Sequence, residues 1–205
     1  AMLAAELRLH DVRVLVLEKE TEPASFVRIV GLHIRSLELM AMRGLLDRLL
    51  QHGRQRPAGG FFAAIPKPAP KGLDSAYAYL LGIPQPVIEH LLEERAIELG
   101  AQVRHGCAVA GFEQDDEGVT VELADGEQLR TRYLVGCDGA RSAVRKSIGR
   151  ELQGDSANHA WGVMDVLAVT DFPDIRFKSL IQSASDGSII IIPREGGYLV
   201  RLYVE

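Results

Sequence analysis

The sequence has few cysteines, no long apolar run and no cluster of basic residues, and each absence excludes a class of protein. Cys107 and Cys137 are the only cysteines and form no C-x-x-C motif, so we expect a reduced, cytoplasmic protein in which Cys137 is a small buried residue. No apolar stretch reaches the length of a membrane span, and the N-terminus lacks the pattern of a signal peptide. The six histidines have no metal-ligand spacing, so we predict no metal site and no membrane partner.

The charge balance argues against nucleic acid as a partner. The 205 residues include 28 Asp and Glu against 23 Lys and Arg, which gives a formal net charge of -5, and the basic residues are scattered. Hydrophobic residues make up 47% of the chain and charged residues 25%, as is ordinary for a soluble globular protein. This length suffices for one large domain, or for one domain and part of another.

The first residues predict part of a dinucleotide-binding fold. Met2 to Leu9 reads as a helix, and Val12 to Glu18 reads as a short buried strand that ends in an acid. This order is typical of the second half of a βαβ unit, in which the terminal acid binds an adenosine ribose. Glu18 is therefore a candidate ribose ligand, with a solvated charge as the alternative, and Lys19 could reach the same adenosine. The G-x-G-x-x-G turn of such a unit is absent.

The middle of the chain predicts helices followed by an antiparallel meander. Ser36 is expected to cap a helix through Leu50, and Pro84 to open another that ends at Gly100. The Pro- and Gly-rich residues 56–72 are expected to form a loop. The remaining strands of this part are predicted at 77–83, 108–113, 119–123 and 128–135.

A Gly-bracketed aspartate is the most informative feature of the sequence. In residues 133–145, YLVGCDGARSAVR, an apolar strand leads into Asp138 and a helix follows. Gly136 and Gly139 would let the backbone approach a ligand, and Asp138 could accept hydrogen bonds from ribose hydroxyls. The alternative is that Asp138 is a turn residue that only starts the helix at Ser142.

This run resembles the Asp-Gly motif, C-D-G-x-x-S-x-V-R, of the flavin-dependent aromatic hydroxylases. Residues 28–38, RIVGLHIRSLE, are similar to the R-x-R-G-L-H-x-R-S-x-E stretch of the rifampicin and polyketide monooxygenases in that superfamily, with Val30 where a second Arg often stands. Residues 83–86, IPQP, resemble the I-P-Q tract of the same enzymes. The resemblance to this branch extends over residues 1–149.

The resemblance implies a set of residues that bind FAD. Arg28 would contact the flavin cofactor, Gln85 would lie near the diphosphate and ribityl chain, and Val109 would meet the adenine through its backbone. Ordinary core packing is the alternative for Val109, and a surface salt bridge or cap is the alternative for the polar residues of the 28–38 and 83–86 tracts. The predicted cofactor-binding residues are Glu18, Lys19, Arg28, Arg35, Gln85, Val109 and Asp138.

The expected fold is α/β, with two incomplete domains. Residues 1–158 are predicted to form a doubly wound, Rossmann-like FAD-binding domain with the meander inserted. Residues 159–205 are predicted to begin an antiparallel β-sheet substrate domain, and residues 160–205 resemble that of the phenol hydroxylases. Residues 193–195 could line a phenol pocket or form a polar hairpin tip. The first strand with its glycine turn and the C-terminal part are predicted to be missing. Strands of the second domain are expected at 161–170, 177–183, 188–192 and 198–204.

The resemblance implies an FAD-dependent, NAD(P)H-consuming monooxygenase. It would hydroxylate a phenolic or polyketide-like aromatic substrate with molecular oxygen through a flavin C4a-hydroperoxide. The absence of a G-x-S-x-G elbow fits an enzyme whose cofactor carries the chemistry, and no catalytic residue is identified. Without the glycine turn, the isolated chain is expected to bind FAD weakly or not at all. The alternatives are a non-catalytic remnant or interaction module, and an epoxidase, halogenase or reductase of the same fold. A homodimer is left open.

Overall fold

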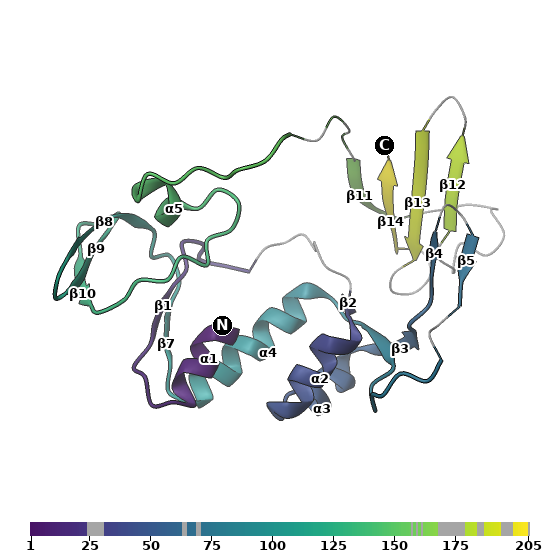
Figure 1. The fold of residues 1–205 in the computed structure, drawn as a ribbon, viewed down its shortest axis with the longest axis horizontal. Helices are drawn as coiled ribbons and strands as arrows, with labels where there is room; N and C mark the ends of the chain where they lie inside the picture. The colour runs from purple at the N-terminus through teal and green to yellow at the C-terminus, as the bar shows by residue number, and fades with distance from the viewer. Residues whose placement is uncertain are drawn as a thin grey trace. The chain divides into compact units, whose positions relative to one another are not determined.

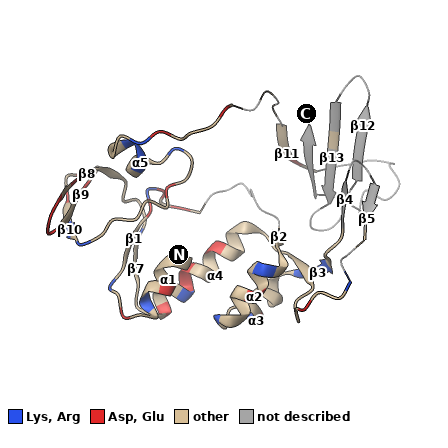
Figure 2. Cartoon of the chain, viewed as in Figure 1, with Lys and Arg blue, Asp and Glu red and all other residues tan. Residues whose placement is uncertain are grey.

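The chain divides in the computed structural model into two units, residues 1–152 and residues 153–205 (Figure 1). The structure describes residues 1–23, 31–62, 65–68, 71–156, 158, 160, 162–167, 179–183, 187–193 and 199–204. Acidic and basic residues are both spread over the described helices and strands of the first unit (Figure 2). No helix in the described part of the chain is long and apolar enough to span a membrane.

A parallel strand pair organises one half of the first unit. β1 (Leu15–Leu17) pairs with β7 (Gln102–Arg104), and each strand follows a helix, α1 (Met2–Arg8) and α4 (Gln85–Glu98) respectively. The two helices pack against each other through small side chains, which permit a close approach of their backbones. The buried residues of this contact are Ala4, Ala5, Ala96 and Ala101. The predicted helix–strand order at the N-terminus is confirmed.

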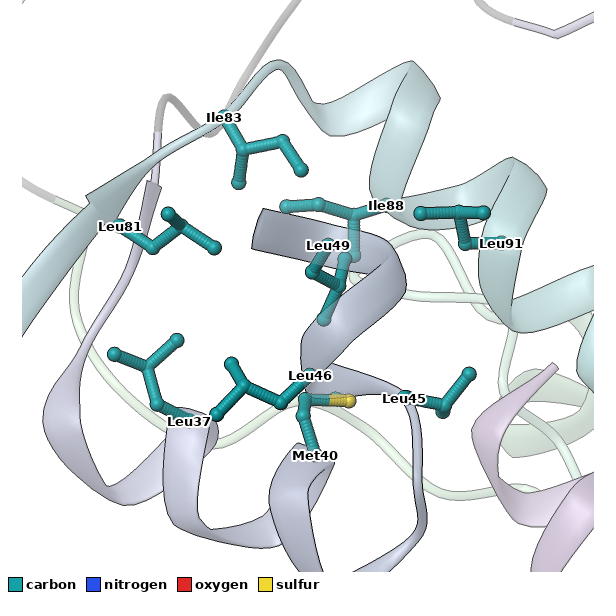
Figure 3. Close-up of a cluster of buried hydrophobic side chains, with 9 residues drawn as sticks. All are labelled: Leu37, Met40, Leu45, Leu46, Leu49, Leu81, Ile83, Ile88 and Leu91. Atoms are coloured by element: carbon teal, nitrogen blue, oxygen red, sulfur yellow. The ribbon is translucent and has the colours of Figure 1, made fainter. Parts of the chain in front are cut away.

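A second core lies between two short helices and a three-stranded antiparallel sheet. The helices are α2 (Ile34–Met42) and α3 (Leu46–His52). The sheet has the order β2 (Gly31–Leu32), β6 (Tyr79–Gly82), β3 (Arg54–Pro57). The buried side chains of this core come from both helices, from α4 and from β6, and they point toward one another (Figure 3). They are Leu37, Met40, Leu45, Leu46, Leu49, Leu81, Ile83, Ile88 and Leu91.

The prediction of one helix from Ser36 to Leu50 is wrong. The first helix begins at Ile34, after His33, and ends at Met42. Gly44 then adopts a left-handed φ of 68°, with its N–H bonded to the Ala41 carbonyl and the next N–H bonded to the Met40 carbonyl. This is the glycine-dependent arrangement that terminates a helix and satisfies its last carbonyls. A second helix follows, so the apolar periodicity continues across the break and conceals it.

The prediction of a loop or lid-like excursion at residues 56–72 is wrong where the structure has strands, at 56–57, 60–62 and 65–67. Residues 54–57 form β3, an edge strand of the three-stranded sheet, and a two-stranded hairpin follows it. The hairpin pairs β4 (Gly60–Phe62) with β5 (Ile65–Lys67). Proline is tolerated in both places because an edge strand has N–H groups that need no ladder partner.

The antiparallel meander is confirmed. It consists of β8 (Val109–Asp115), β9 (Gly118–Leu123) and β10 (Gln128–Thr131), with β9 in the middle. Its core of Val119, Val121 and Leu123 packs against Leu17 at the end of β1. The last strand ends at Thr131 and not at residue 135. Thr131 pairs with Val119, near the start of β9, so the partner strand extends no further. A five-residue helix, α5 (Ala143–Ser147), packs against β8.

The second unit contains a four-stranded antiparallel sheet, as the sequence predicts. Its strands are β11 (Gly162–Leu167), β12 (Ser179–Ser183), β13 (Gly187–Pro193) and β14 (Leu199–Val204). The order is β11-β14-β13-β12, so the last strand inserts between the first and the third. The predicted hairpin tip at residues 193–195 lies largely outside the described residues.

Candidate functional site

Glu18 lies directly after β1, where the parallel strand pair ends. Its backbone N–H donates to the Arg104 carbonyl at 2.9 Å, and its own carbonyl accepts from the Cys107 N–H at 2.9 Å. The side chain is exposed, and its Oε1 accepts a hydrogen bond from the Glu20 N–H at 3.0 Å. The backbone is therefore fixed, while the carboxylate stays accessible to a hydroxyl donor. Lys19 is exposed, with its Nζ 3.1 Å from Glu20 Oε1.

An open cavity of about 300 Å³ adjoins this strand end. It is joined to Glu18 through the Cys107 backbone, which contributes to the wall of the cavity. Its lining residues are Gly106, Cys107, Ala108, Leu123, Ala124 and Asp125. Val109 follows the lining at the start of β8, and its side chain packs on the meander core. Core packing therefore accounts for that side chain, and a contact between its backbone and adenine stays a prediction.

Asp138 caps the short helix that follows it. Its Oδ2 accepts hydrogen bonds from the N–H groups of Ala143 at 2.6 Å and Val144 at 3.2 Å. The helix starts at Ser142, as the turn alternative for Asp138 predicted, and Ser142 is its N-cap, with its Oγ accepting from the Arg145 N–H at 3.0 Å. The hydrogen bond from the Ser142 side chain lowers the pKa of Asp138 most, and the two backbone N–H groups add to this effect. Asp138 therefore starts the helix, as the turn alternative predicted, and its side chain is exposed.

The glycine at position 136 is needed because the side chain of Val144 packs against its backbone. A Cβ added to Gly136 would lie 2.8 Å from the Cβ of Val144, so α5 packs directly on the glycine backbone. On the other side of the loop, Arg145 Nη2 donates to the Ala140 carbonyl at 3.0 Å. Residues 136–145 therefore form one tightly packed loop and helix. The prediction that Cys137 is buried is wrong, because its side chain is exposed beside this contact.

Replacement of Asp138 by alanine is expected to destabilise α5, because two backbone donors lose their acceptor. The expected loss is about 1 kcal/mol of unfolding free energy at neutral pH. Since the pKa of Asp138 is lowered in the folded chain, this contribution is present above the ordinary aspartate pKa and is lost as pH falls through the folded-state pKa. Urea unfolding at several pH values checks this. Asp116→Ala, at an exposed turn position of the meander, is the control and should leave the pH dependence unchanged; equal behaviour of the two variants would contradict the capping role.

Arg35 and Gln85 lie near the other end of the first unit, on helices that start beside β2 and β6. Arg35 Nη1 is 2.9 Å from Glu38 Oε2 and holds the pKa of that carboxyl below its usual value. Gln85 Nε2 donates to Glu89 Oε1 at 2.5 Å. Arg35 also lines an open groove of about 560 Å³ along α2. The surface ion pair considered for Arg35 therefore exists, and Arg28 lies outside the described residues.

The structure thus places the candidates in two groups. Glu18 and Lys19 follow the end of β1, whose Leu17 packs with Val109 on the meander core, and Asp138 caps α5, which packs on β8. Arg35 and Gln85 lie near the β2–β6 pair. The sequence did not single out the turn at residues 104–107, which fixes Glu18. No sequence pattern indicates this turn, because its hydrogen bonds join residues 18–20 to residues 104–107, which are far apart in the sequence.

Comparison with known proteins gives consistent matches. Residues 1–205 match the family described as "FAD binding domain". The rifampicin monooxygenase of Streptomyces venezuelae is 58% identical over 154 residues, which cover 75% of this chain and 32% of the relative. That of Rhodococcus hoagii is 51% identical over 173 residues, 83% of this chain and 36% of the relative. The solved structure of the OxyS anhydrotetracycline hydroxylase from Streptomyces rimosus superposes with a TM-score of 0.88 at 36% identity, over 99% of this chain and 42% of that one. The chain spans about a third of the length of these curated relatives.

Proposed function

Because the chain belongs to the FAD binding domain family, we propose that it binds FAD and supplies the cofactor-binding part of an aromatic monooxygenase. The observation that carries the proposal is the match of the whole chain to that family, together with relatives named as monooxygenases. The position of an accessible acid at the end of a parallel strand supports it independently, since this is where dinucleotide-binding folds hold the adenosine ribose. The alternative of a non-catalytic module is not favoured by these relatives.

The residues of the first unit fit an adenine dinucleotide. Glu18 offers an exposed carboxylate to ribose hydroxyls, beside an open cavity with a mostly uncharged lining. Lys19 stands next to it as a cation that could meet a phosphate. We assign Val109 to the adenine through its backbone, and Arg28, Arg35, Gln85 and Asp138 to the remaining parts of the cofactor. Bound FAD would supply the redox chemistry, and the protein would orient the reactants and exclude water.

The finer parts of the proposal concern reductant, substrate and architecture. NAD(P)H is the proposed reductant, and a phenolic or polyketide-like aromatic compound is the proposed substrate, with oxygen as the co-substrate. The names of the relatives, which include rifampicin and anhydrotetracycline monooxygenases, support this substrate class. We further propose that β1 and β7 belong to a doubly wound sheet, that residues 1–158 form the FAD-binding domain, and that residues 159–205 contribute to substrate binding.

Binding is tested by NMR titration of the isotope-labelled chain with FAD up to millimolar concentration. We expect weak binding, with amide shifts concentrated at Glu18, Lys19, Val109 and Asp138. Glu18→Ala should weaken FAD binding about tenfold, because a charged acceptor for ribose hydroxyls is lost. Glu22→Ala, at an exposed acid four positions further on, is the matched control and should bind like the unaltered chain. Shifts spread at random, or an equal effect of both variants, would overturn the assignment of Glu18.

Activity is tested in a chimera, because the chain spans only about a third of its relatives. The matching segment of the Streptomyces venezuelae rifampicin monooxygenase is replaced by this chain, and FAD content and rifampicin-dependent NADPH oxidation are measured. A yellow chimera that consumes NADPH supports the proposed function. A correctly folded but colourless chimera would favour the non-catalytic alternative.

A further inference from the structure

The backbone of Glu18 is bound to the turn at the end of β7, residues 104–107. Beyond the regular strand pair, three backbone hydrogen bonds join the turn to the segment after β1. They run from Glu18 N to Arg104 O at 2.9 Å, from Cys107 N to Glu18 O at 2.9 Å, and from Gly106 N to Glu20 O at 3.1 Å. Gly106 has a left-handed φ of 70°, and a Cβ there would lie 3.2 Å from Thr21. The turn and the backbone of Glu18 are therefore directly connected.

The turn is itself anchored by a histidine. His105 Nε2 lies 2.9 Å from Glu93 Oε1 on α4, so the side chain ties the turn to the helix packed beside β7. On the other flank, Arg104 Nη1 lies 2.9 Å from Glu127 Oε1 at the turn between β9 and β10. The Arg104 anchor keeps its charge at every physiological pH, whereas the His105 anchor does not.

The surroundings of His105 are mainly acidic. Glu93 binds it from α4, and the segment after β1 adds the charge of Glu18 and a hydrogen bond with the Glu20 backbone. On its own turn are Arg104, which is paired with Glu127, and Cys107. The hydrogen bond to the Glu93 carboxylate is the main reason that the pKa of His105 is raised, with smaller support from the Glu20 backbone and the charge of Glu18. Loss of the proton leaves the carboxylates of Glu93 and Glu18 without the imidazolium charge.

We propose that His105 is a positioning residue for the nucleotide site: paired with Glu93, its protonated form holds the turn and, through it, the Glu18 carboxylate, so that the affinity for FAD depends on pH. The inference rests on the proposed function, in which Glu18 binds the adenosine ribose. The sign follows from the raised pKa. The ion pair is fully present below the ordinary histidine pKa and is lost as pH rises through the folded-state pKa, so FAD binds more weakly on the alkaline side.

The test is an NMR titration of the 205-residue chain with FAD between about pH 5 and about pH 8, the range in which histidine changes charge. FAD is the probe because its diphosphate keeps its charge over this range. The ring shifts of His105 report its pKa, and the amide shifts of Gly106 and Cys107 report the turn. We expect these amides to titrate with the His105 midpoint, and the dissociation constant of FAD to rise about two- to fivefold across it.

Two variants separate positioning from general structural damage. His105→Gln should give a pH-independent FAD affinity in a folded chain, and Glu93→Gln should lower the His105 midpoint and reduce the effect. His90→Gln removes another histidine–glutamate pair, 3.2 Å from Glu94 on the same α4, and should leave the pH profile as it was. Titrating amides with a flat FAD affinity would overturn the inference and leave the proposed function standing. Absence of FAD binding at every pH would also overturn the inference, and the FAD content of the chimera would then decide the proposed function.

Discussion

Replacement of Leu81 by alanine is expected to lower the free energy of unfolding of residues 1–152 by about 3 to 4 kcal/mol. Leu81 is fully buried in the middle strand of the β2-β6-β3 sheet. Its side chain packs in the buried cluster formed by α2, α3, α4 and β6, and it also lies against the backbone of Gly53, where an added Cβ would lie 2.6 Å from Leu81 Cδ1. The cavity that the alanine leaves is bounded partly by paired strands, which cannot easily move to fill it. We therefore expect a loss of unfolding free energy in the upper half of the range for buried Leu→Ala substitutions.

Urea unfolding followed by far-UV circular dichroism checks this, because the described helices all belong to the first unit. Leu152→Ala removes the same atoms from a side chain that is 69% exposed and should cost less than about 0.5 kcal/mol. Similar losses in the two variants would show that the core around Leu81 is not packed as described.

Replacement of Gly118 by alanine is expected to disrupt the meander and to cost at least about 2 kcal/mol. Gly118 opens β9 with a φ of 153°, a conformation that side-chain-bearing residues rarely adopt. A Cβ there would also overlap the carbonyl oxygen of Thr131 on β10 and lie 3.3 Å from the Arg132 Cα. Both obstacles are backbone atoms, so relief requires β9 and β10 to separate. Val121 and Leu123 of the meander core lie on the same strand.

A series of three glycines separates the two contributions. Gly126 has a φ of 89° with no atom within 4 Å of an added Cβ, and Gly111 has neither a positive φ nor a close neighbour. We expect Gly111→Ala to change stability by less than about 0.5 kcal/mol and Gly126→Ala to cost about 1 kcal/mol. Unfolding free energies, with NMR amide spectra of the meander, rank the three variants. An equal cost for Gly118 and Gly126 would refute the contact with β10.

The parts of the fold that depend on nearby residues could be predicted from the sequence. The N-terminal helix follows from the spacing of its apolar residues, and the helix opened by Pro84, the two meander turns and the start of the helix at Ser142 follow from helix-start and turn residues a few positions away. The break after Met42 was missed because leucines on both sides continued the helical period, although Gly44 was a visible stop signal. Strand β3 was missed because its partner, β6, lies beyond a Pro- and Gly-rich stretch that resembles a loop.

For the candidate site, residue types were easier to predict than their neighbours. The position of Glu18 at a strand end follows from the apolar run before it. The turn at residues 104–107 could not be foreseen, because its hydrogen bonds to Glu18 join two segments that only the folded chain brings together. The exposure of Cys137 was mispredicted because Gly136, the residue before it, takes the packing position against Val144. The roles of Arg35, Gln85, Val109 and Asp138 in cofactor binding stay predictions.

The parallel pairing of β1 with β7 also bears on the order in which the protein folds. Leu15 lies opposite Gln102, and the chain between them includes α2, α3 and α4. The meander hairpin and the α2–α3 pair close short loops and can form early, whereas the parallel pair must first overcome the entropy of closing a long one. Three residue pairs form the ladder, and the hydrogen bonds of Glu18 and Glu20 to residues 104–107 extend it. We therefore expect the strand end that carries Glu18 to become ordered late in folding.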